Sequence, residues 1–405
     1  MEDTPRKVVG LDVGTENVRA VVLSASRDGW AVVGYGEARN GGMHKGVVSN
    51  LSGPGEAIDR MLMEVERMSD FQVNSAYVSI NGSHVISTKT SGMIALGADN
   101  HEIDEGDLIR VEDSAVTGRI PANREVLSVL PLDYTLDGQS GIRDPRGMTG
   151  VRLEILANVI SALTPNCNNL RKAVGEVAKV ETLRMIPSPM AAAAAVLTER
   201  QRENGVAVVD LGAATTSVAI YEEGYLQHIG VIPMGSSNIT NDLAICLEID
   251  ADTAEEIKLK YVSADFSESD KEINMKRGSE EIRFTRTEMN EIVEARLLEI
   301  FERVNKLLKA AHYDRKLPEG VVLVGGGAKM QGIDKFAKTV LKTAVKVGAP
   351  SGLAGVAESV EKPEFATAVG LALAAAQDEM EGVSVAKKAN QQKTGLSWFK
   401  KIFKN

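Results

Sequence analysis

The chain has 405 residues, a length that suits two large domains or several smaller ones with separate cores. Its 43% hydrophobic and 25% charged residues are ordinary for a globular protein, and its net charge of −10 argues against a nucleic-acid partner. The two cysteines, Cys167 and Cys246, lack metal-type spacing, and we interpret both as reduced core residues. We expect no signal peptide and no transmembrane segment.

The first part of the chain has the mixed pattern of an α/β domain. Four apolar runs have the length of strands: residues 8–13, 18–24, 30–36 and 75–81. A helix is expected over residues 55–68, because its apolar residues recur at helical spacing. This order of elements favours an α/β fold.

Residues 82–160 differ in composition from the sequence around them. They are rich in Asp, Gly and Pro, contain turn signals at 138–141 and 144–147, and include short strand-like pieces such as 126–130. We interpret them as a small α+β insertion. The α/β pattern is expected to resume at residues 153–162, with helices at 166–177 and 190–198.

A second α/β half is predicted from residue 206, interrupted by a mainly helical part at 236–318. Thr285 and Glu288 match a capping box at the start of a long helix. Seven apolar residues behind it fall on one helical face: Met289, Val293, Leu297, Ile300, Val304, Leu308 and Ala311. A short strand pair is expected near residues 272–284, and the α/β pattern returns at residue 321.

One phrase occurs in both halves of the chain. The phrase occurs at residues 8–22 and again at residues 206–220. Each copy consists of an apolar run, then Asp-x-Gly, then small or polar residues, and then a second apolar run. Each copy predicts a strand, a tight turn and a strand. The turn exposes backbone N–H groups, and Asp12 or Asp210 beside it can hold a metal-bound water. Two such turns are expected to bind a polyphosphate from both sides.

A third glycine cluster follows a predicted buried strand at residues 321–324. Gly325, Gly326 and Gly327 allow the backbone to approach a flat ligand or a ribose closely, and a helix is expected to begin directly after them. The N-terminus of such a helix favours phosphate. Any one of the three clusters is more simply an ordinary turn. Three clusters in this order favour a nucleotide site.

These three phrases resemble the phosphate 1, phosphate 2 and adenosine motifs of the actin/Hsp70/sugar-kinase superfamily. The chain resembles most closely the FtsA family, the bacterial cell-division homologues of actin, over nearly its whole length. Further phrases typical of that family lie at residues 81–84, 136–139, 144–148, 239–244, 254–258 and 365–371.

The resemblance implies an α/β, actin-like fold of two halves with the nucleotide between them. Subdomain 1A would comprise residues 1–81 and 161–190, and the inserted subdomain 1C would comprise residues 82–160. Subdomain 2A would comprise residues 191–235 and 319–378, and the helical subdomain 2B residues 236–318. A flexible linker at 379–394 and an amphipathic membrane-targeting helix at 395–405 would complete the chain.

The resemblance also implies that ATP and Mg²⁺ bind in the cleft. Asp12 and Asp210 would be the catalytic acids and, through water, the metal ligands. The residues expected to bind the nucleotide are Gly14, Thr15, Asn17, Gly212, Thr215, Thr216, Gly235, Glu255, Lys258, Gly325, Gly326, Gly327 and Met330. From the residues alone, Glu255 and Lys258 are equally an i,i+3 ion pair on a solvated helix face.

Two departures from the family pattern bear on hydrolysis. In the second phosphate turn, Ala213, Ala214 and Ser217 stand where the family commonly has two glycines and an acid. Ser188 stands where the family usually has a Glu or Gln, in a region that positions the attacking water. Phosphoryl transfer depends on such positioning. We therefore predict ATP binding with slow or undetectable hydrolysis.

The end of the chain indicates a membrane partner without help from the resemblance. On a helix, one side of residues 395–405 is apolar and the other carries lysines. The residues expected to contact the membrane are Leu396, Trp398, Phe399, Lys400, Lys401, Ile402, Phe403 and Lys404. Such a helix suits an anionic membrane surface. The alternative is a helix that docks on the protein's own core.

The function implied by the resemblance is that of a cell-division adaptor on the cytoplasmic face of the bacterial inner membrane. It would polymerise with itself, bind the C-terminal peptide of FtsZ through residues 236–318, and recruit later division proteins through the insertion. The alternatives are a pilus-assembly relative that binds an inner-membrane partner peptide and, in a different class, a small-molecule kinase of the same superfamily.

Overall fold

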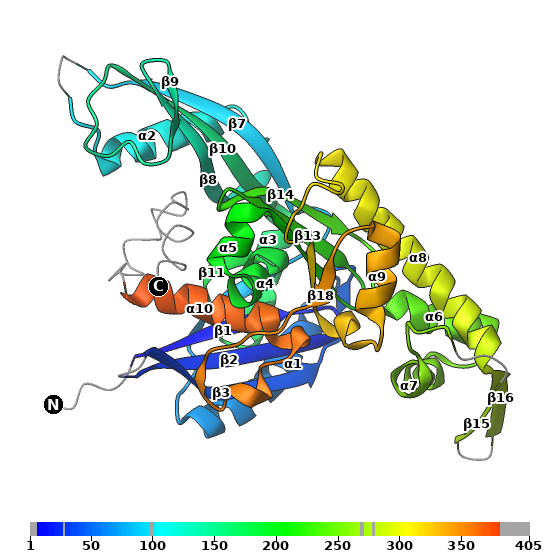
Figure 1. Cartoon of the computed structure of the whole chain (residues 1–405). Helices are drawn as coiled ribbons and strands as arrows, with labels where there is room; N and C mark the ends of the chain where they lie inside the picture. The colour runs from blue at the N-terminus through cyan, green and yellow to red at the C-terminus, as the bar shows by residue number, and fades with distance from the viewer. Residues whose placement is uncertain (1–5, 27–28, 98–100, 268–270, 278–279, 381–405) are drawn as a thin grey trace.

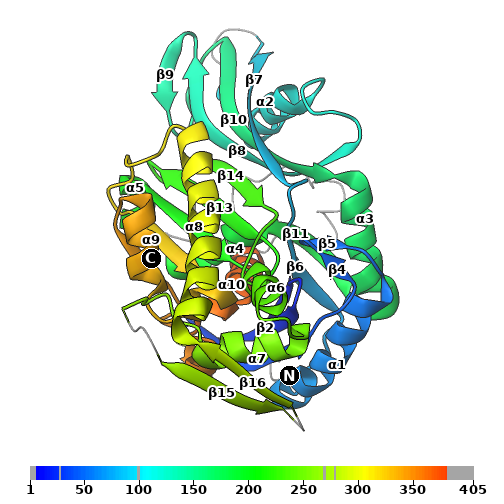
Figure 2. The same cartoon turned by 90° about the vertical axis from the view of Figure 1, so that its right-hand side faces the viewer.

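The computed structural model describes residues 6–26, 29–97, 101–267, 271–277 and 280–380. These residues form two α/β halves, an insertion that projects at the top of both views, and a helical part on the second half (Figures 1 and 2). No helix in these ranges is long and apolar enough to cross a membrane. The predicted C-terminal helix at 395–405 lies outside the described residues.

The first half is built on a six-stranded sheet in the order β11-β6-β1-β2-β3-β19. Strands β1, β2 and β3 are antiparallel neighbours, whereas β6 and β11 continue the sheet in parallel on the other side of β1. The strands are β1 (Lys7–Val13), β2 (Asn17–Ser26), β3 (Gly29–Arg39), β6 (Ser75–Ile80), β11 (Glu181–Pro187) and β19 (Ala354–Gly355). The first four predicted strands are confirmed.

The second half repeats this arrangement in a five-stranded sheet, in the order β14-β13-β12-β17-β18. Strands β12, β13 and β14 are antiparallel neighbours, and β17 and β18 lie parallel to β12 on its other side. The strands are β12 (Val206–Leu211), β13 (Thr216–Glu222), β14 (Tyr225–Ile232), β17 (Val321–Val324) and β18 (Val345–Val347). The repeated phrase is therefore the central hairpin of each sheet.

The insertion is a four-stranded antiparallel sheet in the order β7-β10-β8-β9, with helix α2 (Glu105–Val116) on one face. Its strands are β7 (Ile86–Ala95), β8 (Arg124–Leu136), β9 (Gln139–Ile142) and β10 (Arg152–Leu163). The short strand predicted at 126–130 lies within β8, which extends further at both ends. The run at 153–162 does not resume the α/β pattern, because β10 pairs with β7 and β8.

The insertion also contacts the second half of the molecule. Asn158 Nδ2, on β10, donates to the backbone oxygen of Leu226 on β14 at 2.9 Å. The backbone N–H of Ile229, also on β14, donates to Ser87 Oγ of β7 at 3.0 Å. The insertion is therefore joined covalently to the first half and by hydrogen bonds to the second.

The helical part contains α6 (Ser237–Cys246), α7 (Ala251–Tyr261), α8 (Arg286–Ala310) and the hairpin of β15 (Glu272–Arg277) and β16 (Glu280–Thr285). The predicted capping box of Thr285 and Glu288 begins α8. The predicted apolar face is buried up to Leu308, and Ala311 is half-buried where the helix ends. Cys167 is buried, but Cys246, in the last turn of α6, is exposed, so the interpretation of Cys246 as a core residue is wrong.

Helix α10 (Ala366–Met380) packs tightly between elements of the first half. It contacts β1 and α4 (Ser188–Val196). A Cβ at Gly370 would lie 1.7 Å from the backbone oxygen of Ala191, so only glycine permits this approach. Near the helix end, Tyr77 donates to the Asp378 carboxylate. Residues 379 and 380, expected in the linker, continue this helix.

The remaining elements cover the sheets or connect them. The predicted first helix is α1, and its expected face is buried against β2 and β3. The elements that cover or connect the sheets are α1 (Ser52–Ser69), α3 (Thr164–Lys172), a π-helical turn (Ala173–Val177), α5 (Glu199–Asn204), α9 (Ile333–Leu341) and the hairpin of β4 (Met43–His44) and β5 (Val47–Val48).

Candidate functional site

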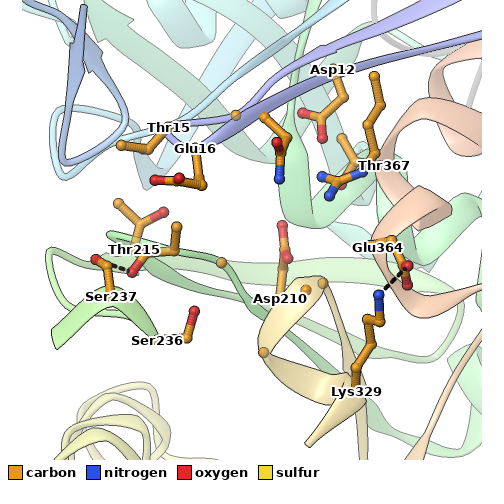
Figure 3. A pocket seen from close by; sticks show the side chains of 18 of the residues that line it. Asp12, Thr15, Glu16, Asp210, Thr215, Ser236, Ser237, Lys329, Glu364 and Thr367 are labelled. Carbon is orange, nitrogen blue, oxygen red and sulfur yellow. Dashed lines mark hydrogen bonds and ion pairs between the residues drawn. The ribbon is translucent and has the colours of Figure 1, made fainter. Parts of the chain in front are cut away.

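A cavity of about 610 Å³ lies between the two halves, a volume typical of small-molecule sites. Its walls include both Asp-x-Gly turns and the third glycine cluster (Figure 3). The predicted site residues that line it are Asp12, Gly14, Thr15, Asn17, Asp210, Gly212, Thr215, Glu255, Lys258, Gly325, Gly326, Gly327 and Met330. The structure thus brings together residues from both halves of the chain.

Two predicted residues, Thr216 and Gly235, lie behind the cavity wall. Thr215, in the turn just before β13, lines the cavity, whereas Thr216, the first residue of β13, is buried and donates to the backbone oxygen of Met234 at 2.8 Å. A Cβ at Gly235 would lie 2.5 Å from the backbone oxygen of Ala213. Gly235 therefore allows the chain before α6 to support the second turn.

Asp12 and Asp210 occupy equivalent places near the ends of β1 and β12 and extend toward the same space from opposite walls (Figure 3). Burial raises the pKa of Asp12. Burial, together with the nearby Asp12 carboxylate, raises the pKa of Asp210 to about 7. Two buried carboxylates that repel each other are stabilised by a cation between them.

The acid pair fits Mg²⁺ only in combination with a ligand. Within the described ranges, no three His, Cys, Asp or Glu side chains converge to hold a metal ion. Mg²⁺ is often held by one or two carboxylates and completes its shell with water and substrate phosphate oxygens. Asp12 and Asp210 are a donor set of that kind. They supply oxygen ligands and charge but leave most of the coordination shell to phosphate and water.

Both turns are fixed by hydrogen bonds from neighbouring segments of the chain. Asn40 Nδ2 donates to the backbone oxygen of Gly14 at 2.6 Å, and the backbone N–H of Gly46 donates to Thr15 Oγ1 at 3.2 Å. In the second turn, Ser237 Oγ donates to the backbone oxygen of Ala213 at 2.7 Å. The backbone of each turn is therefore held in place before any ligand enters.

Glu255 and Lys258 are both an ion pair and part of the cavity wall. Their charged atoms lie 2.6 Å apart, and Lys258 Nζ also donates to Thr240 Oγ1 at 2.9 Å. The Lys258 side chain is only 11% exposed, so the helix face is not solvated there. The ion-pair interpretation and the binding interpretation are thus compatible in this structure.

The third glycine cluster approaches the acids directly. Gly325 has a φ of +87°, and a Cβ there would lie 2.3 Å from Asp210 Oδ1. The helix predicted after the glycines is instead a 3₁₀ turn (Gly326–Lys329), and α9 begins only at Ile333. Gly332, with a φ of +79°, separates the two. The argument that a helix N-terminus favours phosphate at this place is therefore wrong.

Several residues of the wall were not predicted. Arg19 Nη2 donates to Glu37 Oε1 at 2.6 Å, and Lys329 Nζ lies 2.8 Å from Glu364 Oε1. Arg19 is the direct partner of Asp12 across β1 and β2, so strand pairing could have placed it beside the acid. The unpredicted polar residues that line the cavity are Glu16, Arg19, Glu37, Asn81, Ser236, Ser237, Lys260, Lys329, Gln331, Glu364 and Thr367.

Solved structures with low sequence identity share this fold. The PilM–PilN type IV pilus biogenesis complex aligns with a TM-score of 0.67 at 17% identity, over 91% of this chain and 98% of that chain. MreB5 of Spiroplasma citri, solved bound to ADP, aligns with a TM-score of 0.53 at 14% identity, over 95% and 98% of the two chains. The architecture is that of an actin-like ATPase fold, as predicted.

Sequence relatives identify the family within this class. The family model "Cell division protein FtsA" matches residues 207–370, and "SHS2 domain inserted in FTSA" matches residues 82–161. The cell division protein FtsA of Pseudomonas aeruginosa is 35% identical over 94% of this chain and 92% of its own length. The FtsA of Escherichia coli K12 is 31% identical over 98% of this chain and 97% of its own length. The chain belongs to the FtsA family and is an actin-like cell-division protein.

Proposed function

We propose that the cleft binds ATP together with Mg²⁺. The observation that carries this proposal is the pair of Asp-x-Gly turns that line one cavity from opposite halves, with Asp12 and Asp210 directed into it. The turns would hold the phosphates, and the two acids would hold Mg²⁺ and its water. Glu255, Lys258 and the glycine cluster would face the nucleoside. Calorimetric titration with ATP, with Mg²⁺ and then with EDTA, tests the site; absence of binding in Mg²⁺ refutes it.

Hydrolysis in this site is proposed to be slow. Ser188, the first residue of α4, lines the cavity where a longer Glu or Gln would orient water. The serine side chain is shorter than that of Glu or Gln, and the residue is only 3% exposed. Loss of an orienting group is expected to lower the rate by orders of magnitude. Turnover of about 1 s⁻¹ or faster, the low end for kinases, would contradict this proposal.

The chain is further proposed to act at the cytoplasmic face of the inner membrane through residues 395–405. Full burial of a large apolar side chain contributes about 1.5–3 kcal/mol, and a lysine near anionic lipid contributes about 1 kcal/mol. Because ordering so short a helix offsets much of this gain, one tail binds weakly and many tails on a polymer bind strongly. Sedimentation with phosphatidylglycerol vesicles tests this, and equal binding by a chain that ends at Thr394 would refute it.

Polymerisation and FtsZ binding complete the proposal. The helical part, α6 to α8, would receive the C-terminal peptide of FtsZ, and the insertion would contact later division proteins. Exposed apolar side chains on the helical part support a docking role: Ile245, on α6, is 75% exposed and Leu298, on α8, is 42% exposed. A pull-down with the FtsZ peptide separates this function from that of a pilus-assembly protein. Electron microscopy on a lipid monolayer with ATP tests filament formation.

Membership in the FtsA family favours this function over the two alternatives. The PilM–PilN similarity lies at 17% identity and concerns the fold. The FtsA relatives reach 31–35% identity over nearly the whole chain. A small-molecule kinase would need a second substrate pocket with a base, and phosphorylation of sugars or acetate by the purified chain would be the observation that favours it.

A further inference from the structure

Asn81 connects the first half to the second phosphate turn. It directly follows β6, immediately before the insertion begins at Gly82, and it lines the cavity. Its Nδ2 donates to Thr215 Oγ1 at 3.2 Å, and its Oδ1 accepts from Ser217 Oγ at 2.9 Å. Thr215 lies in the turn just before β13, and Ser217 is the second residue of β13. One amide of the first half thus holds two hydroxyls of the second.

A backbone contact fixes the orientation of this amide. The N–H of Gly82 donates to Asn81 Oδ1 at 2.8 Å. Since a backbone N–H can only donate, the atom that faces it must be the amide oxygen, and the NH₂ group must face Thr215. Ser217, which is fully buried, donates to the same oxygen and reinforces this orientation.

The orientation of the amide determines what the Thr215 hydroxyl can do. An amide NH₂ has no acceptor, so the hydroxyl accepts from it and keeps its own hydrogen for another partner. Thr215 is 4% exposed and faces the cavity, and in the part of the chain that the structure describes its hydroxyl donates to no protein group. A buried hydroxyl of this kind suits an anionic oxygen as acceptor. The neighbouring Thr216, in contrast, already donates to Met234.

We propose that Asn81 is a positioning residue that orients the Thr215 hydroxyl as a hydrogen-bond donor to a phosphate oxygen of the bound nucleotide. This inference rests on the proposed ATP site and adds the residue that prepares one of its contacts. Ser217 is part of the same arrangement. The family commonly has an acid at position 217. A carboxylate there would face Asn81 Oδ1, and both groups would be acceptors, whereas the Ser217 hydroxyl donates to Asn81 Oδ1.

The isosteric variant Asn81→Asp tests the orientation with little change of shape. Its carboxylate accepts from Gly82, Ser217 and Thr215, so the Thr215 hydrogen turns away from the cavity and a negative charge lies beside the phosphates. We expect the affinity of the full-length protein for ATP with Mg²⁺, measured by calorimetry, to fall about tenfold or more. The control Ser87→Ala removes a hydrogen bond between the insertion and the second half, outside the cavity wall, and should bind ATP as the wild type does.

A double-mutant cycle separates positioning from general structural support. If Asn81 acts through the Thr215 hydroxyl, Asn81→Ala should weaken ATP binding about three- to tenfold in the wild type and have little effect in a Thr215→Val protein. Thermal unfolding without nucleotide establishes that each variant is folded, and the cycle decides the question if Asn81→Asp does not fold.

Two results would overturn the inference. One is an equal loss of affinity from Asn81→Ala in both backgrounds, and the other is unchanged ATP affinity in a folded Asn81→Asp protein. A wild-type chain that binds no ATP would instead refute the nucleotide site, and with it this role of Asn81. The three outcomes are distinguishable in the same set of titrations.

Discussion

Replacing Asp210 by asparagine tests whether the two buried acids form a cation site. Burial and the Asp12 carboxylate raise the pKa of Asp210 from an ordinary 3.8 to about 7. At pH 8 without nucleotide, Asp210 is therefore mainly ionised in the folded protein, although it is buried beside Asp12. Asp210→Asn removes this buried charge and keeps the shape of the side chain.

The expected gain in stability depends on pH. The pKa of Asp210 is higher in the folded than in the unfolded protein, so its ionisation destabilises the fold increasingly as the pH rises from about 4 to 7. One pKa unit corresponds to about 1.4 kcal/mol, and relaxation of the cleft reduces the full effect. We expect Asp210→Asn to raise the free energy of unfolding by about 1–3 kcal/mol at pH 8, and by much less at pH 5.

Urea unfolding at pH 8 and pH 5 measures this difference, first with EDTA and then with Mg²⁺ and ATP. The nucleotide should stabilise the wild type at pH 8 and stabilise Asp210→Asn little, because the variant lacks one metal-facing carboxylate. Asp59→Asn, on the exposed side of α1, is the matched control and should change neither result. A nucleotide-free Asp210→Asn protein that is less stable than the wild type at pH 8 would refute the reasoning.

Three further predictions concern the wall of the cavity and the end of the chain. Gly235→Ala places a Cβ 2.5 Å from the backbone oxygen of Ala213, so denaturant unfolding should show a loss of about 1–3 kcal/mol, together with weaker ATP binding. Unchanged stability would show that the second turn can move aside. Lys258→Met breaks the ion pair with Glu255 and should weaken ATP binding about three- to tenfold in calorimetry, and equal affinity would place the nucleoside elsewhere. Deletion of residues 395–405 should abolish sedimentation with anionic vesicles and leave ATP affinity unchanged, whereas lost ATP affinity would indicate docking of the tail on the protein itself.

The sequence predicted the parts of the site that depend on local pattern. The Asp-x-Gly phrases form the central hairpins of both sheets, because an apolar run, a glycine turn and a second apolar run specify a strand pair by themselves. The buried face of α8 followed from helical spacing in the same way. Asp12 and Asp210 were therefore predictable as residues at the ends of equivalent strands.

Contacts between distant segments were not predictable from these patterns. Nothing near Asn81 in the sequence indicates that its amide meets Thr215 and Ser217, since the contact depends on how the two halves face each other. The ion pair of Lys329 and Glu364 likewise joins the glycine cluster to the start of α10.

The attachment of the insertion to β14 makes the molecule a closed ring of contacts. Starting from the first half, the ring runs through the insertion to the second half by the Ser87 and Asn158 hydrogen bonds, and it returns across the hydrogen bonds of Asn81 with Thr215 and Ser217. Because the two halves are joined both through the insertion and directly, each set of contacts resists rotation of one half about the other set. If ATP or a polymer neighbour moves the halves, the movement must slide or break the contacts on β14, and the outer surface of the insertion then shifts with the occupancy of the cleft.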